Sequence, residues 1–254
     1  MSKTIKRYSN GDKITVEEIA NTIDHSLLRP DITVKELIEG CKIARENGCI
    51  SVCVRPSDLP IVVKELKDSD VLVTTVAAFP HGVATTESKL FETKDAIEKG
   101  AVEVDVVMNY GRFLSEDYDY VEDELKQLAE LAHSKNAKLK VIFENHYLTP
   151  EQIKKACQIA VSANVDFVKT STGYAPSGSK VEDLKIMREN ITDTMEVKSA
   201  GGVRNLEQTL AVLSTGAVRI GTRGTEAILN EAKENAVEGY LIVSDHPVEL
   251  SKEY

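Results

Sequence analysis

The 254-residue sequence has no long apolar run, no paired-cysteine motif and no excess of basic residues. A membrane-spanning helix needs about 20 apolar residues, and no stretch approaches that length. Residues 1–7 are polar and basic and lack the apolar segment of a signal peptide, so we expect a cytoplasmic protein with no membrane partner. The net charge of −10 comes from scattered acidic residues, which argues against nucleic acid as a partner.

Metal-binding motifs are also missing. The four cysteines form no CxxC pair, and they show no metal-ligand spacing with the five histidines. We therefore expect reduced, buried thiols, no metal and no cofactor. Because the overall charge is negative, any site for an anionic ligand must arise from local geometry.

Short apolar strands alternate with helical segments along nearly the whole chain. The predicted strands are 23–28, 50–54, 71–76, 102–108, 139–144, 165–168, 195–198 and 217–220. A helix is predicted after each strand, at 34–47, 60–67, 86–99, 120–134, from 150, 181–190, 206–214 and 225–236, and a short helix opens near Thr15. On the helix after Thr33, the residues expected to share the buried face are Val34, Leu37, Ile38, Cys41, Ile43 and Ala44.

Eight strand–helix units within about 225 residues predict a (β/α)8 TIM barrel of the α/β class. Strands without polar alternation indicate a parallel sheet that is covered by helices. A doubly wound open sheet is the alternative, but no GxGxxG motif follows an early strand. We predict one TIM-barrel domain over residues 1–254, with the barrel at about 19–236, a short N-terminal helix and a C-terminal tail at 237–254.

Lys169 follows the apolar segment 165–168, at the point where a buried strand is predicted to end. In a barrel of this kind, reactive side chains lie at the carboxyl ends of the strands. Burial disfavours an ammonium, so a lysine in this place can be a neutral amine that attacks a carbonyl and forms a Schiff base. The alternative is a strand-end lysine that extends into solvent.

Other polar residues near the predicted strand ends are candidates for the same site. They are Asp24, Cys53, Asp105, Lys140, Glu144 and Lys198. Three lysines on three strands are costly to bury unless they pair or shift their pKa values. Lys198 is expected to lower the pKa of Lys169, since like charges destabilise the protonated amine. Asp105 interrupts an apolar strand, and alternation places it opposite Val104 and Val106, on the side expected to face the barrel lumen. It is expected either to relay protons or to pair with a lysine for structural reasons.

Two glycine-containing loops, 199–204 and 221–224, follow the last two predicted strands. Glycine lets backbone N–H groups approach an anion, and the loops after strands 7 and 8 form the usual phosphate site of this fold. We therefore expect a phosphate or carboxylate ligand there. The residues expected to bind it are Gly201, Gly202, Gly221, Thr222 and Arg223.

Five segments together resemble the deoxyribose-phosphate aldolase family. They are IDHSLL at 23–28, SVCV at 51–54, EVDVVMN at 103–109, VKTSTG at 168–173 and VKSAGGVR at 197–204, in the family's order between about residues 17 and 230. The resemblance implies a class I aldolase that uses no metal and takes part in nucleoside catabolism. Such enzymes reversibly cleave 2-deoxy-D-ribose 5-phosphate to D-glyceraldehyde 3-phosphate and acetaldehyde.

The resemblance also implies roles for individual residues. Lys169 matches the Schiff-base lysine, Lys198 the lysine that lowers its pKa and assists proton transfer, and Asp105 the aspartate of the proton relay. The pocket-supporting residues are then Asp24, Lys140, Cys53 and Thr172, with Gly173 beside the phosphate. Some family members end in a tyrosine that reaches the active site, which assigns this role to Tyr254. A phosphorylated sugar is the implied partner. The oligomeric state stays open, with a homodimer or a homotetramer as the alternatives to a monomer.

Five positions depart from the family pattern. They are Arg55, His81, His146, Arg223 and Gly224. Arg223 and Gly224 stand where two serines are usual, and an arginine suits either a phosphate or a carboxylate. Two alternatives therefore stay open: an aldolase of the same family for another sugar phosphate or an acidic sugar derivative, and a catalytically silent barrel that binds a sugar phosphate.

Overall fold

The computed structural model describes residues 6–250, and in this range eight parallel strands close into a barrel. The strands are β2 (Ile23–Leu27), β3 (Ser51–Val54), β4 (Leu72–Ala77), β5 (Glu103–Val107), β6 (Lys138–Ile142), β7 (Phe167–Lys169), β8 (Glu196–Ala200) and β9 (Arg219–Thr222). The barrel closes because β2 pairs with β9 as well as with β3. The predicted TIM barrel is thus confirmed, and the doubly wound open sheet is excluded.

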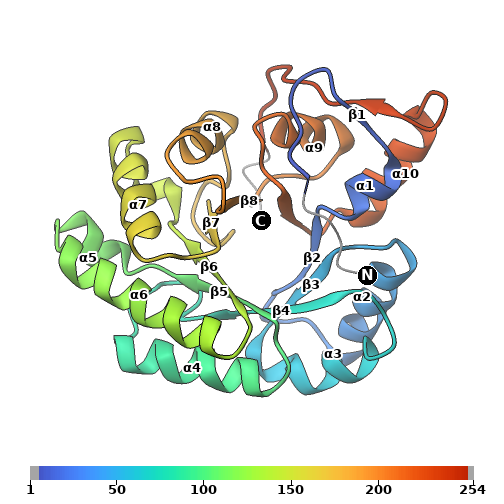
Figure 1. Ribbon diagram of the computed structural model, residues 1–254. Helices are drawn as coiled ribbons and strands as arrows, with labels where there is room; N and C mark the ends of the chain where they lie inside the picture. Colours follow the sequence, from blue (N-terminus) through green and yellow to red (C-terminus); the bar gives the residue numbers. More distant parts are fainter. Residues whose placement is uncertain (1–5, 251–254) are drawn as a thin grey trace.

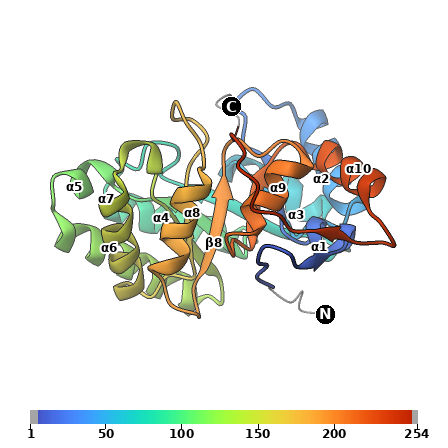
Figure 2. The same ribbon diagram turned by 90° about the horizontal axis from the view of Figure 1, so that it is seen from above.

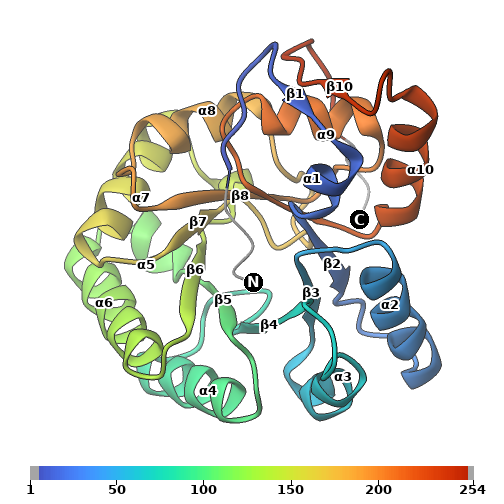
Figure 3. The ribbon, with the colours of Figure 1, turned by 45° about the vertical axis from the view of Figure 1, so that its right-hand side comes forward.

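The helices form an outer ring around the strands (Figures 1 and 3). The ring consists of α2 (Val34–Glu46), α3 (Leu59–Glu65), α4 (Thr86–Glu98), α6 (Tyr118–Ser134), α7 (Pro150–Ser162), α8 (Val181–Glu189), α9 (Leu206–Leu213) and α10 (Thr225–Asn235). Shorter pieces are α1 (Val16–Ala20), α5 (Tyr110–Leu114) and 3₁₀ turns at Pro56–Asp58 and Asn145–Tyr147. Among the described residues, no helix is long and apolar enough to span a membrane.

Helix starts follow from local chemistry that is readable in the sequence. Thr15 accepts a hydrogen bond from the Glu18 N–H, and the Glu18 carboxylate accepts one from the Thr15 N–H, which completes the predicted capping box of α1. Thr149 caps α7 in the same way, with Pro150 at the first helical position. These caps fix the residues at which α1 and α7 begin.

The buried face of α2 differs in part from the predicted one. Leu37, Cys41 and Ala44 are buried as expected, but Val34 is 54% exposed and Ile38 is 40% exposed. The prediction was wrong for these two residues because Gly40 packs directly on Leu27, where a Cβ would lie 2.4 Å from Cδ2. This close contact turns the Gly40 side of α2 toward the barrel and leaves Val34 and Ile38 to one side.

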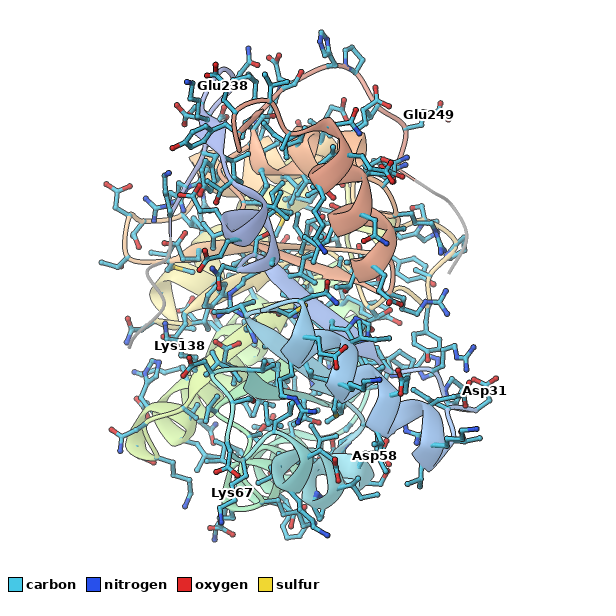
Figure 4. The ribbon with its side chains drawn as sticks, turned by 90° about the vertical axis from the view of Figure 1, so that its right-hand side faces the viewer. Asp31, Asp58, Lys67, Lys138, Glu238 and Glu249 are labelled. Carbon is cyan, nitrogen blue, oxygen red and sulfur yellow. The ribbon has the colours of Figure 1, made fainter. Side chains whose placement is uncertain are left out.

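The structure adds a two-stranded antiparallel sheet that the sequence did not predict. It pairs β1 (Lys13–Ile14) with β10 (Leu241–Ile242), beside α1 and α10 (Figures 2 and 3). The chain after α10 then runs along the outside of the barrel. Figure 4 shows Glu238 on the same side as Lys138, the first residue of β6, and Glu249 on the opposite side with Asp31, which follows β2. The tail at 237–250 therefore crosses from the amino to the carboxyl end of the barrel.

Candidate active site

Three of the predicted lysines converge on one carboxylate inside the barrel. Lys169, the last residue of β7, is 2% exposed, and its Nζ donates a hydrogen bond to Oδ2 of Asp105 at 2.7 Å. Lys198 donates to the same oxygen at 2.8 Å, and Lys140 donates to Oδ1 at 2.8 Å. The structure thus gathers Lys140, Lys169, Lys198 and Asp105 into one buried cluster.

Strand register explains this convergence. Asp105 pairs with Lys140 across β5 and β6, and Lys169 pairs with Lys198 across β7 and β8. Successive side chains of a strand point to opposite faces, so Asp105 points inward while Val104 and Val106 pack in the outer apolar core. The predicted inward orientation of Asp105 is confirmed.

The lysines of the cluster differ in electrostatics. Burial lowers the pKa of Lys169. Asp105 opposes this shift with its negative charge, and the nearby ammonium of Lys198 adds to it. Burial also opposes the charge of Lys198, but Asp105 and Asp24 outweigh burial and raise its pKa. The pKa of Asp105 is held well below its ordinary value, because Lys140, Lys169 and Lys198 outweigh the cost of burying its charge. A buried amine of lowered pKa beside a permanent ammonium can act as a nucleophile toward carbonyl carbon.

Two further charged residues, Arg219 and Glu103, extend this cluster toward the amino ends of the strands. The sequence had given no reason to assign them a role. Arg219 Nη1 donates to Asp24 Oδ1 at 2.6 Å, and Arg219 Nη2 donates to Glu103 Oε1 at 2.9 Å. Asp24 Oδ2 in turn lies 2.5 Å from Lys198 Nζ. Glu103 lies two residues before Asp105, so the alternation that placed Asp105 in the lumen also placed Glu103 there.

A small pocket of about 30 Å³ opens above the lysines. Its lining residues are Asp24, Ser26, Leu28, Cys53, Lys169, Thr172, Lys198, Ala200, Gly201 and Gly221. Cys53 belongs to a separate apolar cluster with Leu28, Val76 and Phe79. Burial, followed by the charge of Asp105, raises the pKa of the Cys53 thiol to about 11. The thiol is therefore neutral at physiological pH, and it contributes to an apolar wall beside Lys169.

Thr172 lines the pocket, and Glu144 holds it in place. Glu144 was predicted within a strand, but β6 ends at Ile142 and Glu144 has φ 57°, which directs its carboxylate back toward the next strand. The carboxylate accepts hydrogen bonds from both the N–H and the hydroxyl of Thr172. Burial raises the pKa of Glu144. This pair fixes the loop that follows Lys169.

The glycine loops after β8 and β9 form a narrow cradle beside the pocket. Gly201 and Gly202 have φ of 81° and 99°, and Gly201 lies so close to Gly178 that a Cβ at Gly178 would meet the Gly201 oxygen at 2.4 Å. Gly173 supports this packing, since its Cα lies 3.7 Å from the place of a Gly201 Cβ. The cradle is lined by Ser26, Gly201, Gly202, Val203, Arg204, Gly221, Thr222 and Arg223. The three glycines contribute only backbone to this lining, and its two cationic residues are Arg204 and Arg223.

Thr222 connects the two cradle loops. Its hydroxyl donates to the Val203 carbonyl at 2.6 Å and accepts from the Gly224 N–H at 2.9 Å. Arg223 and Arg204 line both the cradle and a wider groove of about 560 Å³ on its outer side. Ser26, which the sequence analysis did not single out, lines the pocket, the cradle and the groove. The three hollows therefore lie next to one another.

The remaining departures from the family pattern have separate positions. Arg55 pairs with Asp58 at 2.6 Å and donates to the carbonyls of Arg29, Pro30 and Ile32, so it fixes the loop between β2 and α2. His146 Nδ1 lies 2.7 Å from Ser177 Oγ, whereas His81 is exposed. Tyr254 lies outside the described residues. Within residues 6–250, no group of three or more histidine, cysteine, aspartate or glutamate side chains is arranged to hold a metal ion.

Fold and site together define a parallel (β/α)8 barrel with a buried, lysine-centred site, next to a glycine-lined cradle at the carboxyl ends of its last two strands. A family model described as DeoC/LacD family aldolase matches residues 18–231. The chain therefore belongs to the DeoC/LacD family, and it is an aldolase. The resemblance noted in the sequence is confirmed.

Individual relatives agree with this assignment. A deoxyribose-phosphate aldolase from Clostridium perfringens is 46% identical over 212 residues, which cover 84% of this chain and 94% of the relative. One from Thermococcus gammatolerans is 44% identical over 85% of this chain and 97% of the relative. A solved tetrameric deoxyribose phosphate aldolase from Aeropyrum pernix superposes with a TM-score of 0.81 at 28% identity, covering 87% of this chain and 94% of that chain.

Proposed function

We propose that this chain cleaves 2-deoxy-D-ribose 5-phosphate reversibly to D-glyceraldehyde 3-phosphate and acetaldehyde through a Schiff base on Lys169. The observation that carries the proposal is the buried Lys169 amine, 2.7 Å from a carboxylate that it shares with two other lysines. Relatives with this named activity, at more than 40% identity over most of the chain, support the choice of substrate. A silent binding barrel would not need a buried lysine of lowered pKa, which argues against that alternative.

The reaction follows from the chemistry of an amine and an aldehyde. The Lys169 nitrogen adds to C1, and loss of water leaves an iminium. Removal of the C3 hydroxyl proton then breaks the C2–C3 bond, whose electrons pass to the iminium and leave an enamine while the phosphorylated aldehyde departs. Protonation of the enamine at C2 and hydrolysis release acetaldehyde and restore the lysine.

Asp105 and Lys198 are the groups that we assign to proton transfer in these steps. Both lie beside the reacting amine, with Lys198 Nζ 2.8 Å from the oxygen that also accepts from Lys169. Lys198 is an ammonium in the resting site because Asp105 and Asp24 raise its pKa, so it places positive charge next to Lys169 and holds a proton that it can donate and regain. Lys140, Asp24, Cys53 and Thr172 support the pocket in this proposal.

The phosphate is proposed to lie in the cradle between the loops after β8 and β9. Arg204 and Arg223 line it, together with Gly201, Gly202 and Gly221. The cradle and the lysine pocket share Ser26, Gly201 and Gly221, so a short phosphorylated sugar can span both. Thr222 and Gly173 are proposed to shape the cradle, because Thr222 hydrogen-bonds to Val203 and Gly224 and Gly173 packs beside Gly201.

Borohydride trapping tests the proposal directly. We expect deoxyribose 5-phosphate and borohydride to leave a stable adduct on the peptide that contains Lys169, as read by intact and peptide mass spectrometry. If acetaldehyde labels Lys169 but the sugar phosphate does not, the amine chemistry stands and the substrate assignment is wrong. Labelling by neither compound would overturn the aldolase proposal and favour the silent barrel.

Arg223 provides a separate test of the phosphate end. We expect Arg223→Ser, which introduces the residue usual in the family, to raise the KM for deoxyribose 5-phosphate by roughly 10-fold, the loss of one charged contact. Turnover of unphosphorylated 2-deoxyribose should change little. Arg112→Ser is the control, because Arg112 is an exposed arginine that pairs with Asp117. An unchanged KM, or better use of deoxyribose phosphate, would instead favour an acidic substrate for which Arg223 is adapted.

We further propose that residues 1–254 act as one catalytic domain, in a homo-oligomer and in a reducing compartment such as the cytoplasm. The exposed apolar residues Val34 and Ile38 on α2 and a tetrameric relative support an oligomer. All four cysteines are buried and none is in a disulfide, which suits a reducing compartment. Mass measurement in dilute solution tests the oligomer, and a monomeric mass would overturn it.

A further inference from the structure

Six buried side chains form a closed ring of alternating charge in the barrel lumen. Going round the lumen ring, the successive distances are Arg219–Asp24 2.6 Å, Asp24–Lys198 2.5 Å, Lys198–Asp105 2.8 Å, Asp105–Lys140 2.8 Å, Lys140–Glu103 2.6 Å and Glu103–Arg219 2.9 Å. Each of the six residues is at most 3% exposed. Three carboxylates thus alternate with three cations, and the lumen ring is neutral as a whole.

Arg219 and Glu103 complete the lumen ring from below, away from the pocket. They are absent from the residues that line the pocket, so they have no direct access to a substrate. Phe167, two residues before Lys169 on β7, packs against this part of the lumen ring: its ring centroid lies 5.6 Å from Arg219 Cζ and 5.8 Å from Lys140 Nζ. The lower part of the lumen ring is therefore enclosed by protein.

Lys169 is a seventh ionisable group, attached to the lumen ring through Asp105. Its charged or titratable neighbours come from four directions: Asp105 on β5, Lys198 on β8, Cys53 on β3 and Glu144 after β6. Asp105 already balances two other lysines. A proton on Lys169 would therefore give the lumen ring and Lys169 together a net charge of plus one in a buried site, which is unfavourable.

We propose that Arg219 and Glu103 are positioning residues which keep Lys169 a neutral nucleophile by closing the lumen ring at zero net charge. The inference rests on the proposed Schiff-base function. Arg219 holds Asp24 against Lys198, and Glu103 holds Lys140 against Asp105, so the pair fixes both the geometry and the charge of the groups that touch Lys169. Neither residue takes part in the bond changes.

Two single substitutions should shift the pH at which Lys169 becomes reactive, and they should shift it in opposite directions. Arg219→Met leaves the lumen ring with a net negative charge, which favours protonated Lys169. The pH midpoint at which Lys169 becomes reactive should therefore rise by about one pH unit. Glu103→Gln leaves a net positive charge and should lower the same pH midpoint by a similar amount. The remaining carboxylates keep Lys198 and Lys140 as partners, so Lys169 is the group that takes up or loses the proton.

The measurement is the rate of reductive ethylation of Lys169 by acetaldehyde and cyanoborohydride between pH 5 and 10, read on the Lys169 peptide. The double variant Arg219→Met with Glu103→Gln restores neutrality and should return the midpoint to that of the wild type. Arg219→Lys keeps the positive charge, so it should also keep the wild-type pH midpoint. Lys89→Met is the matched control, because Lys89 forms a fully buried pair with Glu124 outside the lumen.

Opposite shifts that cancel in the double variant would support the proposal, since general loss of stability lowers rates without reversing the direction of a pH shift. Shifts in the same direction, or none in variants that melt cooperatively, would overturn it. If Arg219→Met does not fold, Glu103→Gln and the neutral double variant decide the question alone: an unshifted Glu103→Gln midpoint refutes the proposal. Failure of the wild type to be labelled would refute the Schiff-base function instead.

Discussion

Lys169→Leu should abolish cleavage of deoxyribose 5-phosphate, lowering kcat by about 10⁴-fold or more, because no other amine can replace the nucleophile at the same place. The free energy of unfolding should stay the same or rise. Lys169 is a seventh group beside a lumen ring that is already neutral without it, so replacing it with an apolar residue removes a buried amine without leaving a charge unpaired. Steady-state turnover and urea unfolding at pH 7 measure the two effects.

Lys140→Leu is the matched comparison for stability. Lys140 is as deeply buried as Lys169, but it belongs to the lumen ring and balances both Glu103 and Asp105. Its removal should therefore lower the free energy of unfolding by about 3 kcal/mol, the typical cost of an unpaired buried charge. Equal losses from the two leucine substitutions would show that Lys169 is held as an ordinary ion-pair partner. Substantial turnover by Lys169→Leu would place the nucleophile elsewhere.

Much of this site was predictable because strand periodicity and motif spacing are local properties. Lys169 follows directly on an apolar run, and Asp105 interrupts another one, so each could be assigned to a strand end or an inward face. The two glycine loops were predicted after the last two strands for the same reason. The register of neighbouring strands then brought these residues together, with Lys169 opposite Lys198.

The partners of Arg219 were less accessible to sequence reasoning. Arg219 on β9 meets Glu103 on β5, a strand on the far side of the barrel and 116 residues earlier in the chain. Such a contact depends on closure of the barrel, which no local pattern records. A stricter use of alternation would have placed Glu103 in the lumen beside Asp105, although not its partner.

Other differences also have long-range causes. The pairing of β1 with β10 joins residues 13–14 to residues 241–242, and two-residue strands carry no periodicity. Glu144 was assigned to a strand because the apolar run before it continues, but its left-handed backbone and its contact with Thr172 end β6 earlier. Val34 and Ile38 follow helical spacing, yet the contact between Gly40 and Leu27 decides which side of α2 is buried.

Asp105→Asn should cause the largest loss of stability among single substitutions in the lumen ring, about 3–5 kcal/mol at pH 7. Asp105 is the common counter-ion of Lys140, Lys169 and Lys198, and an amide leaves these buried amines without their shared charge. Turnover should also fall sharply, because the amide cannot relay a proton. Asp31→Asn is the control, since Asp31 is an exposed aspartate that pairs with Arg29.

The pH dependence of this loss identifies its origin. The pKa of Asp105 is well below its ordinary value in the folded state, so its contribution is complete above the unfolded-state pKa of about 3.9 and declines as the pH falls below it. The difference in free energy of unfolding between wild type and Asp105→Asn should then narrow by about 1 kcal/mol per pH unit in acid. Urea unfolding at pH 7, 5, 4 and 3 measures this trend. A difference that stays constant down to pH 3 would show that the loss comes from altered packing, with no contribution from the charge that Asp105 shares among three lysines.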